Sequence, residues 1–250
     1  MLSEGSLLRA LERVGLQAPV RYEEVTGSTQ ATALDLASAG APEWTLVAAG
    51  HQTAGRGRLG RTWSDEPGRS LMFSVVLRPE LDPGSGGLIT LLAGTAMARA
   101  CRELGARYAA CKWPNDVLVD GRKAAGILAE SSVAHGRLEH VVLGVGANLR
   151  EPPTGVPRAG AMRAEAADLL EAFLAAFVRD YRPADPGFAH AVTSAHAGVS
   201  ATLGTRVRAA IDGGSVIEGD AVALDERGGL VVRTSSGERV VRFGEVEHLE

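Results

Sequence analysis

Residues 50–61 read GHQTAGRGRLGR, and this stretch limits the fold and chemistry of the chain more strongly than any other. It contains a literal G-x-G-x-x-G at Gly55, Gly57 and Gly60, a pattern that by itself is weak evidence for a dinucleotide-binding turn. A dinucleotide site needs a helix to begin at the last glycine, but the residues that follow, RTWSDEPG, are typical of a loop. The stretch therefore predicts a glycine-rich loop and not the first turn of a dinucleotide-binding fold.

Arginines alternate with the glycines of this loop, at Arg56, Arg58 and Arg61. Glycine lets backbone N–H groups approach an anion closely, and the forked guanidinium group suits phosphate or carboxylate oxygens. A solvated surface loop and an RNA contact are the alternatives. The formal net charge of −4 and the lack of aromatic residues between the arginines disfavour the RNA contact. We expect an anion-binding loop.

A second group of residues comes from KWPND at 112–116 and RKAAGIL at 122–128. Lys123 begins an otherwise apolar strand, so its ammonium group could point into a cleft. A lysine at a strand end is more often simply exposed, and the arginine loop is what favours the cleft. The chain has no G-x-x-x-x-G-K-[ST] motif, so the phosphates of any bound nucleotide would have to be held by arginines, lysines and backbone amides.

The third segment is VVLGVGANLR at 141–150. Gly144 and Gly146 leave a strand without side chains where a ligand or another backbone could lie close, and Asn148 could offer its amide to an adenine edge. A bulged core strand explains the glycines equally well, and this alternative stays open.

Hydrophobic periodicity predicts an α+β fold, with a mostly antiparallel sheet and helices on one face. We expect helices over residues 2–15, 30–39, 87–105 and 162–181, and strands over 21–25, 45–49, 70–78, 117–119, 123–131 and 140–149. Beyond residue 198 the pattern changes to short strands separated by glycine turns, which predicts a small β-barrel. The expected domains are therefore residues 1–197 and 198–250.

Composition limits the class of protein. The chain has 250 residues, of which 45% are hydrophobic and 22% charged, as expected for a globular protein with a sizeable core. Its acidic balance disfavours nucleic acid as the main partner, and no apolar run is long enough for a membrane span. Cys101 and Cys111 show no metal-binding spacing, so we expect no tightly bound metal, and a reducing cytoplasm.

Four segments, in order, resemble the catalytic core of biotin protein ligases: GSTQ at 27–30, HQTAGRGRLGRTW at 51–63, KWPNDVLVDGRKAAGILAE at 112–130 and VVLGVGANL at 141–149. The resemblance implies the class II synthetase-like fold of biotin and lipoate ligases, with an SH3-like C-terminal barrel. Fewer than about 25 residues precede the first strand, so the chain resembles the monofunctional class without an N-terminal DNA-binding domain.

The resemblance also implies a biotin site. Its expected residues are Ser28, Thr29, Gln30, Gln52, Arg56, Gly57, Arg58, Lys123, Gly126 and Gly144. Ser28 and Thr29 would bind the ureido group, and Gly126 and Gly144 would leave room for the bicyclic ring. Gln30 departs from the Asn that is usual at this position, which adds a methylene group to the side chain.

An ATP and adenylate site is implied in the same way. Its expected residues are Arg56, Arg58, Arg61, Trp63, Lys112, Asn115 and Asn148, and the expected catalytic residues are Lys112, Lys123, Asp116 and Arg58. In the reaction of the family, the acid attacks the α-phosphate of ATP, and an acceptor lysine then displaces AMP. The two lysines would neutralise charge, and Asp116 is the candidate base. Mg²⁺ would accompany ATP, with ligands that the sequence does not identify.

The implied acceptor is the biotin carboxyl carrier domain of acetyl-CoA carboxylase or a related carboxylase, with no nucleic acid and no membrane as partner. A lipoate or octanoate ligase, which would share the fold, is the first alternative. A nucleic-acid-binding module that uses the arginine loop is the second.

Overall fold

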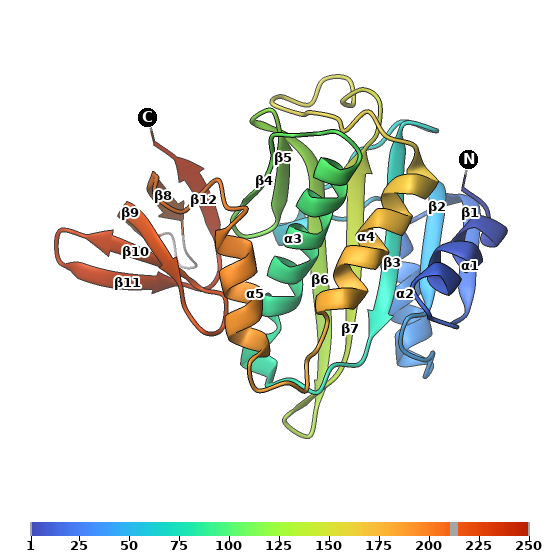
Figure 1. The fold of residues 1–250 in the computed structure, drawn as a ribbon, viewed down its shortest axis with the longest axis horizontal. Coiled ribbons are helices and arrows are strands. Elements are labelled where there is room, and N and C mark those ends of the chain that lie inside the picture. The colour runs from blue at the N-terminus through green and yellow to red at the C-terminus, as the bar shows by residue number, and fades with distance from the viewer. Residues whose placement is uncertain (1, 211–214, 250) are drawn as a thin grey trace.

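The computed structural model describes residues 2–210 and 215–249. Its main body is a seven-stranded sheet with the strand order β1-β2-β3-β7-β6-β5-β4 (Figure 1). Neighbouring strands are antiparallel except for β1 and β2, which are parallel. The strands are β1 (Val20–Thr26), β2 (Leu46–Gln52), β3 (Ser70–Leu77), β4 (Ala109–Lys112), β5 (Asp116–Val119), β6 (Arg122–Ala134) and β7 (Arg137–Asn148). The mostly antiparallel sheet predicted from the sequence is confirmed.

Three helices cover one face of this sheet: α1 (Glu4–Arg13), α3 (Gly87–Glu103) and α4 (Ala166–Asp180). Successive side chains of a strand point to opposite faces, so alternate residues of β3 and β7 meet these helices. The alternation puts Phe73 and Leu143 into the main core, against the aromatic stripe of α4. This face is closed by apolar packing.

The opposite face of the sheet is only partly covered. Here α2 (Thr29–Ser38) packs Ala33 and Ala37 against Val47, Val76 and Val142 in a small separate core. One helix therefore lies across the sheet from the others, where the sequence predicted helices on one face. Beyond α2 the strands carry glycines and small side chains on this face, which leaves it open for a ligand or a loop.

The C-terminal part forms a second sheet, with the strand order β11-β10-β9-β8-β12 and antiparallel neighbours. Its strands are β8 (Arg206–Ala210), β9 (Val216–Leu224), β10 (Leu230–Thr234), β11 (Gly237–Val241) and β12 (Glu245–His248). Helix α5 (Phe188–Ala197) lies between this sheet and α3 (Figure 1). Backbone hydrogen bonds from Cys111 N to Val199 O and from Ala201 N to Cys111 O join the segment before β8 to β4.

Three features differ from the elements expected from the sequence. Strand β4 and helix α5 were not predicted, and the helix expected over residues 162–181 begins only at Ala166. The preceding residues are not helical: Met162 N and Arg163 N donate to the carbonyl oxygens of Asn148 and Leu149, at the end of β7, and Arg163 has a positive φ of 57°. No helix of the described residues is long and apolar enough to cross a membrane.

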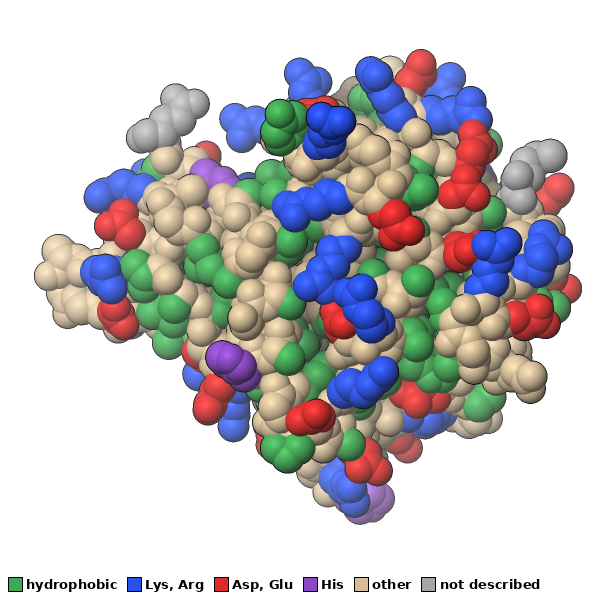
Figure 2. Space-filling model, viewed as in Figure 1, with side chains coloured by type: hydrophobic (Ala, Val, Ile, Leu, Met, Phe, Trp, Pro, Cys, Tyr) green, Lys and Arg blue, Asp and Glu red, His purple; other side chains and the backbone are tan. Residues whose placement is uncertain are grey.

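Charge is mixed on the face that Figure 2 shows, where Lys and Arg side chains alternate with Asp and Glu. Over α3 and α4, Arg99 and Arg179 both pair with Asp180. Both cysteines are free and buried, and burial raises the pKa of each thiol to about 12, as expected for unreactive core residues.

Candidate active site

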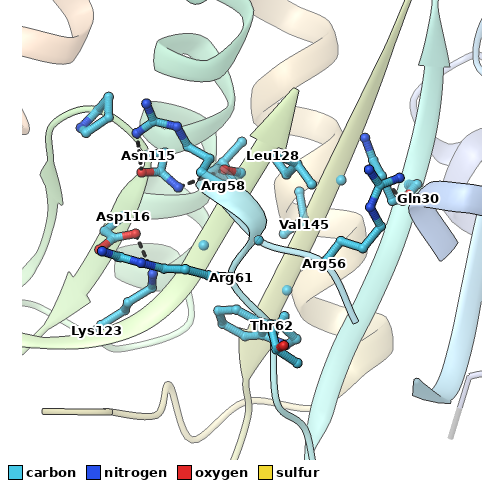
Figure 3. Close-up of a pocket in the computed structure, with 18 of the residues that line it drawn as sticks. Gln30, Arg56, Arg58, Arg61, Thr62, Asn115, Asp116, Lys123, Leu128 and Val145 are labelled. Atoms are coloured by element: carbon cyan, nitrogen blue, oxygen red, sulfur yellow. Dashed lines mark hydrogen bonds and ion pairs between the residues drawn. The ribbon is translucent and has the colours of Figure 1, made fainter. Parts of the chain in front are cut away.

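A cavity lies on the open face of the large sheet, between the arginine loop, the KWPND segment and strand β12. Figure 3 shows Arg58, Asn115, Asp116 and Lys123 gathered at one end and Gln30 at the other. The expected site residues that line it are Ser28, Thr29, Gln30, Gln52, Arg56, Gly57, Arg58, Arg61, Trp63, Lys112, Asn115, Asp116, Lys123, Gly126 and Gly144. The structure therefore brings together residues from four distant segments of the chain.

The arginine loop folds over the cavity, and its two sides run antiparallel to each other. Gly57 N donates to Arg61 O (2.8 Å) and Trp63 N donates to Gly55 O (3.0 Å). A Cβ atom on Gly55 would overlap the carbonyl oxygen of Trp63, so only glycine allows the two sides of the loop to lie this close. At the tip, Gly60 has a positive φ of 72°, which glycine adopts without strain.

A buried carboxylate anchors the base of this loop. Asp65 Oδ2 lies 2.8 Å from His51 Nδ1, and Asp65 Oδ1 accepts from Gln52 N at 3.3 Å. The Asp65 side chain is fully buried. These contacts join the end of β2, where the loop begins, to the residues that follow the loop. They therefore hold the two ends of the loop next to each other. Sequence reasoning missed this pair, because nothing in its spacing relates it to the site.

Each loop arginine has an acceptor within the protein. Arg56 pairs with Glu130 (3.0 Å), and Arg61 forms an ion pair with Glu245 on β12. Arg58 donates from Nη1 to Asn115 Oδ1 at 3.1 Å. The three guanidinium groups are thereby held over the cavity by protein acceptors. Arg56 and Arg61 are exposed enough, at 46% and 64%, to exchange their carboxylate partners for other anions.

Asn115 links the arginine loop to the sheet. Its side-chain Nδ2 donates to Ile127 O on β6, and its backbone carbonyl oxygen accepts from Ile127 N, both at 2.9 Å. Arg58 completes this arrangement by donating from Nη2 to Gly244 O at 3.4 Å. Burial lowers the pKa of the Arg58 guanidinium, and the charges of Asp116 and Glu245 oppose that shift. Arg58 is therefore a partly desolvated cation, which strengthens its attraction for an anion.

Lys123 and Asp116 form an ion pair of 2.7 Å between Nζ and Oδ1. Lys123 Nζ also lies 5.8 Å from the ring centroid of Trp63, within the range of a cation–π contact. Lys112, at the end of β4, lines the same end of the cavity. Two lysines and Arg58 thus concentrate positive charge around one carboxylate.

Trp63 covers the side-chain-free part of the sheet. A Cβ atom on Gly146 would lie 2.5 Å from Trp63 Cε2, and one on Gly126 would lie 3.0 Å from Trp63 Cζ3. Any larger residue at these positions would displace the indole. Trp63 Nε1 is buried and has no hydrogen-bond partner among the described residues. The indole N–H is consequently a donor that remains to be satisfied inside the cavity.

The other end of the cavity is polar but uncharged. Gln52 Oε1 accepts from Thr29 N (2.8 Å) and lies 3.1 Å from Thr29 Oγ1. Ser28 Oγ is buried without a hydrogen-bond partner among the described residues. A buried hydroxyl without a partner costs free energy unless a ligand or water satisfies it. This end is suited to a neutral group with hydrogen-bond donors and acceptors.

Asn148 is the exception among the expected residues. It is buried at the end of β7, and its Nδ2 donates to Gly160 O at 2.9 Å. Asn148 is not among the residues that line the cavity, and this bond holds the loop that follows β7.

Several lining residues were not expected from the sequence. They are Thr62, Ser74, Trp113, Pro114, Ile127, Leu128, Val145, Glu245 and Val246. Ser74 could have been found from the sequence, because it places a hydroxyl group in the middle of the apolar strand SLMFSVVL. Glu245 and Val246 had none, since they reach the cavity only through the packing of the C-terminal sheet.

The acidic residues of the cavity do not suit a resident metal. Asp116 is paired with Lys123, and Glu245 is paired with Arg61. Within residues 2–210 and 215–249, no group of three or more His, Cys, Asp or Glu side chains is arranged to hold a metal ion.

Comparison with known families agrees with this geometry. Residues 22–148 match the biotin/lipoate A/B protein ligase family, and residues 202–249 match the biotin protein ligase C-terminal domain. The chain therefore belongs to the biotin/lipoate A/B protein ligase family and, within it, to the biotin protein ligases. It is 31% identical to the bifunctional ligase/repressor BirA of Bacillus subtilis, over 97% of this chain and 79% of that protein.

Another relative is the biotin–[acetyl-CoA-carboxylase] ligase of Mycobacterium tuberculosis, which is 36% identical over 90% of this chain and 86% of its own length. Among solved structures, the biotin protein ligase of Aquifex aeolicus in complex with biotin and ATP aligns with a TM-score of 0.69 and 25% identity. That alignment covers 92% of this chain and 98% of the other. The R40G mutant of the same enzyme, in complex with biotin, aligns with a TM-score of 0.72. The fold expected from the sequence, including the separate C-terminal sheet, is confirmed.

Proposed function

We propose that this protein activates biotin with ATP to form biotinyl-5′-AMP and transfers the biotinyl group to a lysine of a biotin carboxyl carrier domain. One observation carries the proposal: a single cavity joins a buried, uncharged polar end to a cluster of cations. The first end fits the ureido ring of the acid, and the second fits the carboxylate and the phosphates.

The uncharged end would hold the ring. Ser28 Oγ has no hydrogen-bond partner among the described residues, and Gln52, whose Oε1 accepts from Thr29 N, can donate from Nε2. A cyclic urea offers one carbonyl acceptor and two N–H donors, which matches hydroxyl and amide partners. Trp63 would lie along the ring and acyl chain from the side of the loop.

The cationic end would hold the reacting groups. The biotin carboxylate attacks the α-phosphorus of ATP, a P–O bond forms, and pyrophosphate leaves with the electron pair of the bond that breaks. Lys112, Lys123 and Arg58 are the cations around this position, and Arg56 and Arg61 would exchange their carboxylate partners for phosphate oxygens. Removal of one preorganised donor of this kind typically costs about 3–4 kcal/mol of barrier.

In the second half, the amine of the acceptor lysine attacks the acyl carbon, the C–N bond forms, and AMP leaves. The amine must lose a proton, since lysine has a reference pKa of about 10.4 and is mostly protonated at neutral pH. Asp116 is the proposed acceptor of this proton, and its contact with Lys123 would keep it oriented meanwhile.

Mg²⁺ enters this scheme as part of the substrate, bound to the phosphates of ATP. In the structure the carboxylates of the cavity pair with Lys123 and Arg61, so we assign no resident metal to them. The acceptor is proposed from relatives: those of Mycobacterium tuberculosis and Paracoccus denitrificans are named biotin–[acetyl-CoA-carboxylase] ligases.

Isotope exchange between ATP and pyrophosphate, measured separately with biotin, lipoate and octanoate, tests the proposal. We expect exchange with biotin and at most trace exchange with the other two acids. Exchange that is faster with lipoate or octanoate would assign the protein to the other branch of its family. Salt-sensitive retention on RNA, without exchange with any acid, would instead support the nucleic-acid module.

A further inference from the structure

Ser74 occupies an unusual position on β3. Its side chain is fully buried, as are those of its neighbours Phe73 and Val75, but these two face the main core. The alternation of the strand turns Ser74 to the opposite face, toward α2 and the cavity. There its Oγ lies 3.0 Å from Thr29 Oγ1 and 3.1 Å from Gln30 Oε1.

The amide of Gln30 is fixed at both ends. Its Nε2 donates to Val142 O at 3.0 Å, and its Oε1 accepts from Ser74. Gln30 is 3% exposed, so both bonds are shielded from water. Through the bond to Val142 O, the side chain of Gln30 links α2 to the backbone of β7. One N–H and one lone pair of this amide are therefore engaged within the protein, which fixes the orientation of the side chain at the edge of the cavity.

Gln30 lies directly on Gly144. A Cβ atom on Gly144 would overlap Gln30 Oε1 and would lie 3.4 Å from Ser74 Oγ. We had expected Gly144 to leave room for the ring of the ligand, but the amide of Gln30 occupies that space. The side-chain-free strip of the sheet is consequently bounded by Gln30 at one end and by Trp63, over Gly126 and Gly146, at the other.

We propose that Gln30 is the specificity-determining end wall of the acid pocket and that Ser74 is the positioning residue that holds it. The inference rests on the proposed function, because it defines which ring the pocket admits. A glycine is needed at position 144 because a larger residue would overlap the amide of Gln30, and not because it would meet the ligand. Recognition of the ureido group then falls to Ser28, Thr29 and Gln52.

The first test is a double-mutant cycle of Gly144→Ala and Gln30→Asn, with biotin as the titrant in calorimetry. Gly144→Ala alone should weaken binding at least about tenfold, because the displaced amide would enter the pocket. Gln30→Asn removes the overlapping atoms, so the double variant should bind within about threefold of Gln30→Asn alone. A double variant as weak as Gly144→Ala would mean that the new methyl group meets biotin itself, which would overturn the proposal.

The second test uses Ser74→Ala, which leaves the buried Gln30 carbonyl without its donor. In ATP–pyrophosphate exchange, KM for biotin should rise about tenfold while kcat stays within about twofold, and Ser74→Thr, which keeps the hydroxyl, should recover most of the loss. A change in kcat alone, or no change in KM, would contradict the assignment. Cooperative thermal unfolding of each variant checks the fold. Failure of the proposed function is a separate outcome, since wild-type protein would then bind no biotin.

Discussion

The indole nitrogen of Trp113 donates a hydrogen bond to the carbonyl oxygen of Gly228, with 3.0 Å between the two atoms. Trp113 belongs to the KWPND segment, and Gly228 lies in the turn between β9 and β10 of the C-terminal sheet. Gly228 has a positive φ of 82°, and a Cβ atom there would lie 2.8 Å from Leu91 Cδ1 on α3. A side chain at this position would therefore push the turn away from α3. The catalytic segment is supported by the C-terminal sheet through this contact.

Trp113→Phe should destabilise the protein by about 2 kcal/mol, because the buried Gly228 carbonyl loses its donor and the smaller ring leaves a gap. Urea unfolding measures the change in free energy. Tyr108→Phe is the control, since Tyr108 is 76% exposed and its substitution should change stability by less than about 0.5 kcal/mol. If the two variants lost equal stability, Trp113 would have no structural role between the sheets.

Lys123→Met should abolish ATP–pyrophosphate exchange in a protein that remains folded. Methionine keeps the unbranched apolar part of the side chain but lacks the ammonium group beside Asp116, so the acid and the phosphate would meet without this neutralising cation. We expect the exchange rate to fall at least about a hundredfold. Arg122→Met, at the exposed neighbouring position, is the matched control and should retain exchange. Wild-type rates for Lys123→Met would remove Lys123 from the catalytic machinery.

Much of this architecture was predictable from the sequence because its elements have strong periodic patterns. The helix over residues 87–105 and the strands around 70–78 and 140–149 were predicted within a few residues of α3, β3 and β7. Helix α5 was missed although Phe188, Val192 and His196 are buried at a spacing of four. The rest of the helix is alanine, Thr, Ser and His, so few large apolar side chains mark its buried face, and the periodic pattern is weak until the helix packs against α3.

The site was predictable where residue type alone carried the chemistry. Arginines between glycines and a lysine at a strand start predicted an anion site, and the structure gathers them at one cavity. Contacts that depend on packing were not predictable. Glu245 reaches Arg61 because β12 docks beside the arginine loop, and Gln30 covers Gly144 because α2 crosses that part of the sheet. Neither relationship leaves a pattern along the chain.

Stability should fall as the pH falls from about 6.5 to 4, and His196 should account for part of the loss. Burial lowers the pKa of His196 to about 4, from an ordinary value near 6.5, and its Nδ1 lies 3.2 Å from both Leu91 O and Thr95 Oγ1. Between these pH values the unfolded chain binds a proton at His196 and the folded protein does not, so acid favours unfolding. The shift corresponds to up to about 3 kcal/mol by pH 4.

Urea unfolding at several pH values measures this slope, and His196→Asn supplies the comparison. Asparagine keeps a donor near the Leu91 carbonyl but does not titrate, so the variant should lose less stability between pH 6.5 and 4. Parallel pH profiles for the two proteins would show that His196 does not contribute.

Arg58→Gly should loosen the arginine loop and release the adenylate before transfer. Arg58 joins the loop tip to Asn115 Oδ1 (3.1 Å) and Gly244 O (3.4 Å), and the substitution removes both contacts while it adds conformational freedom. The base of the loop remains tied by Asp65 and His51, so the cavity should still bind biotin. A loop that no longer covers the cavity would expose the reactive mixed anhydride to water and to other amines. Bystander proteins should then be biotinylated.

Labelling of albumin in the presence of biotin and ATP measures that escape, and limited trypsin digestion at Arg56 and Arg61 measures the opening of the loop. Leu59→Gly is the matched control, because Leu59 sits at the exposed tip with a positive φ of 55° and makes neither of the Arg58 contacts. Glycine fits that backbone conformation, so this variant adds flexibility to the same loop while Arg58 stays bound to Asn115. If both variants labelled albumin equally, flexibility alone would explain the escape. If Arg58→Gly labelled no albumin and trypsin cleaved it no faster than wild type, the loop would not retain the adenylate. We expect labelling and faster cleavage with Arg58→Gly alone, since the contacts of Arg58 are what hold the loop over the cavity.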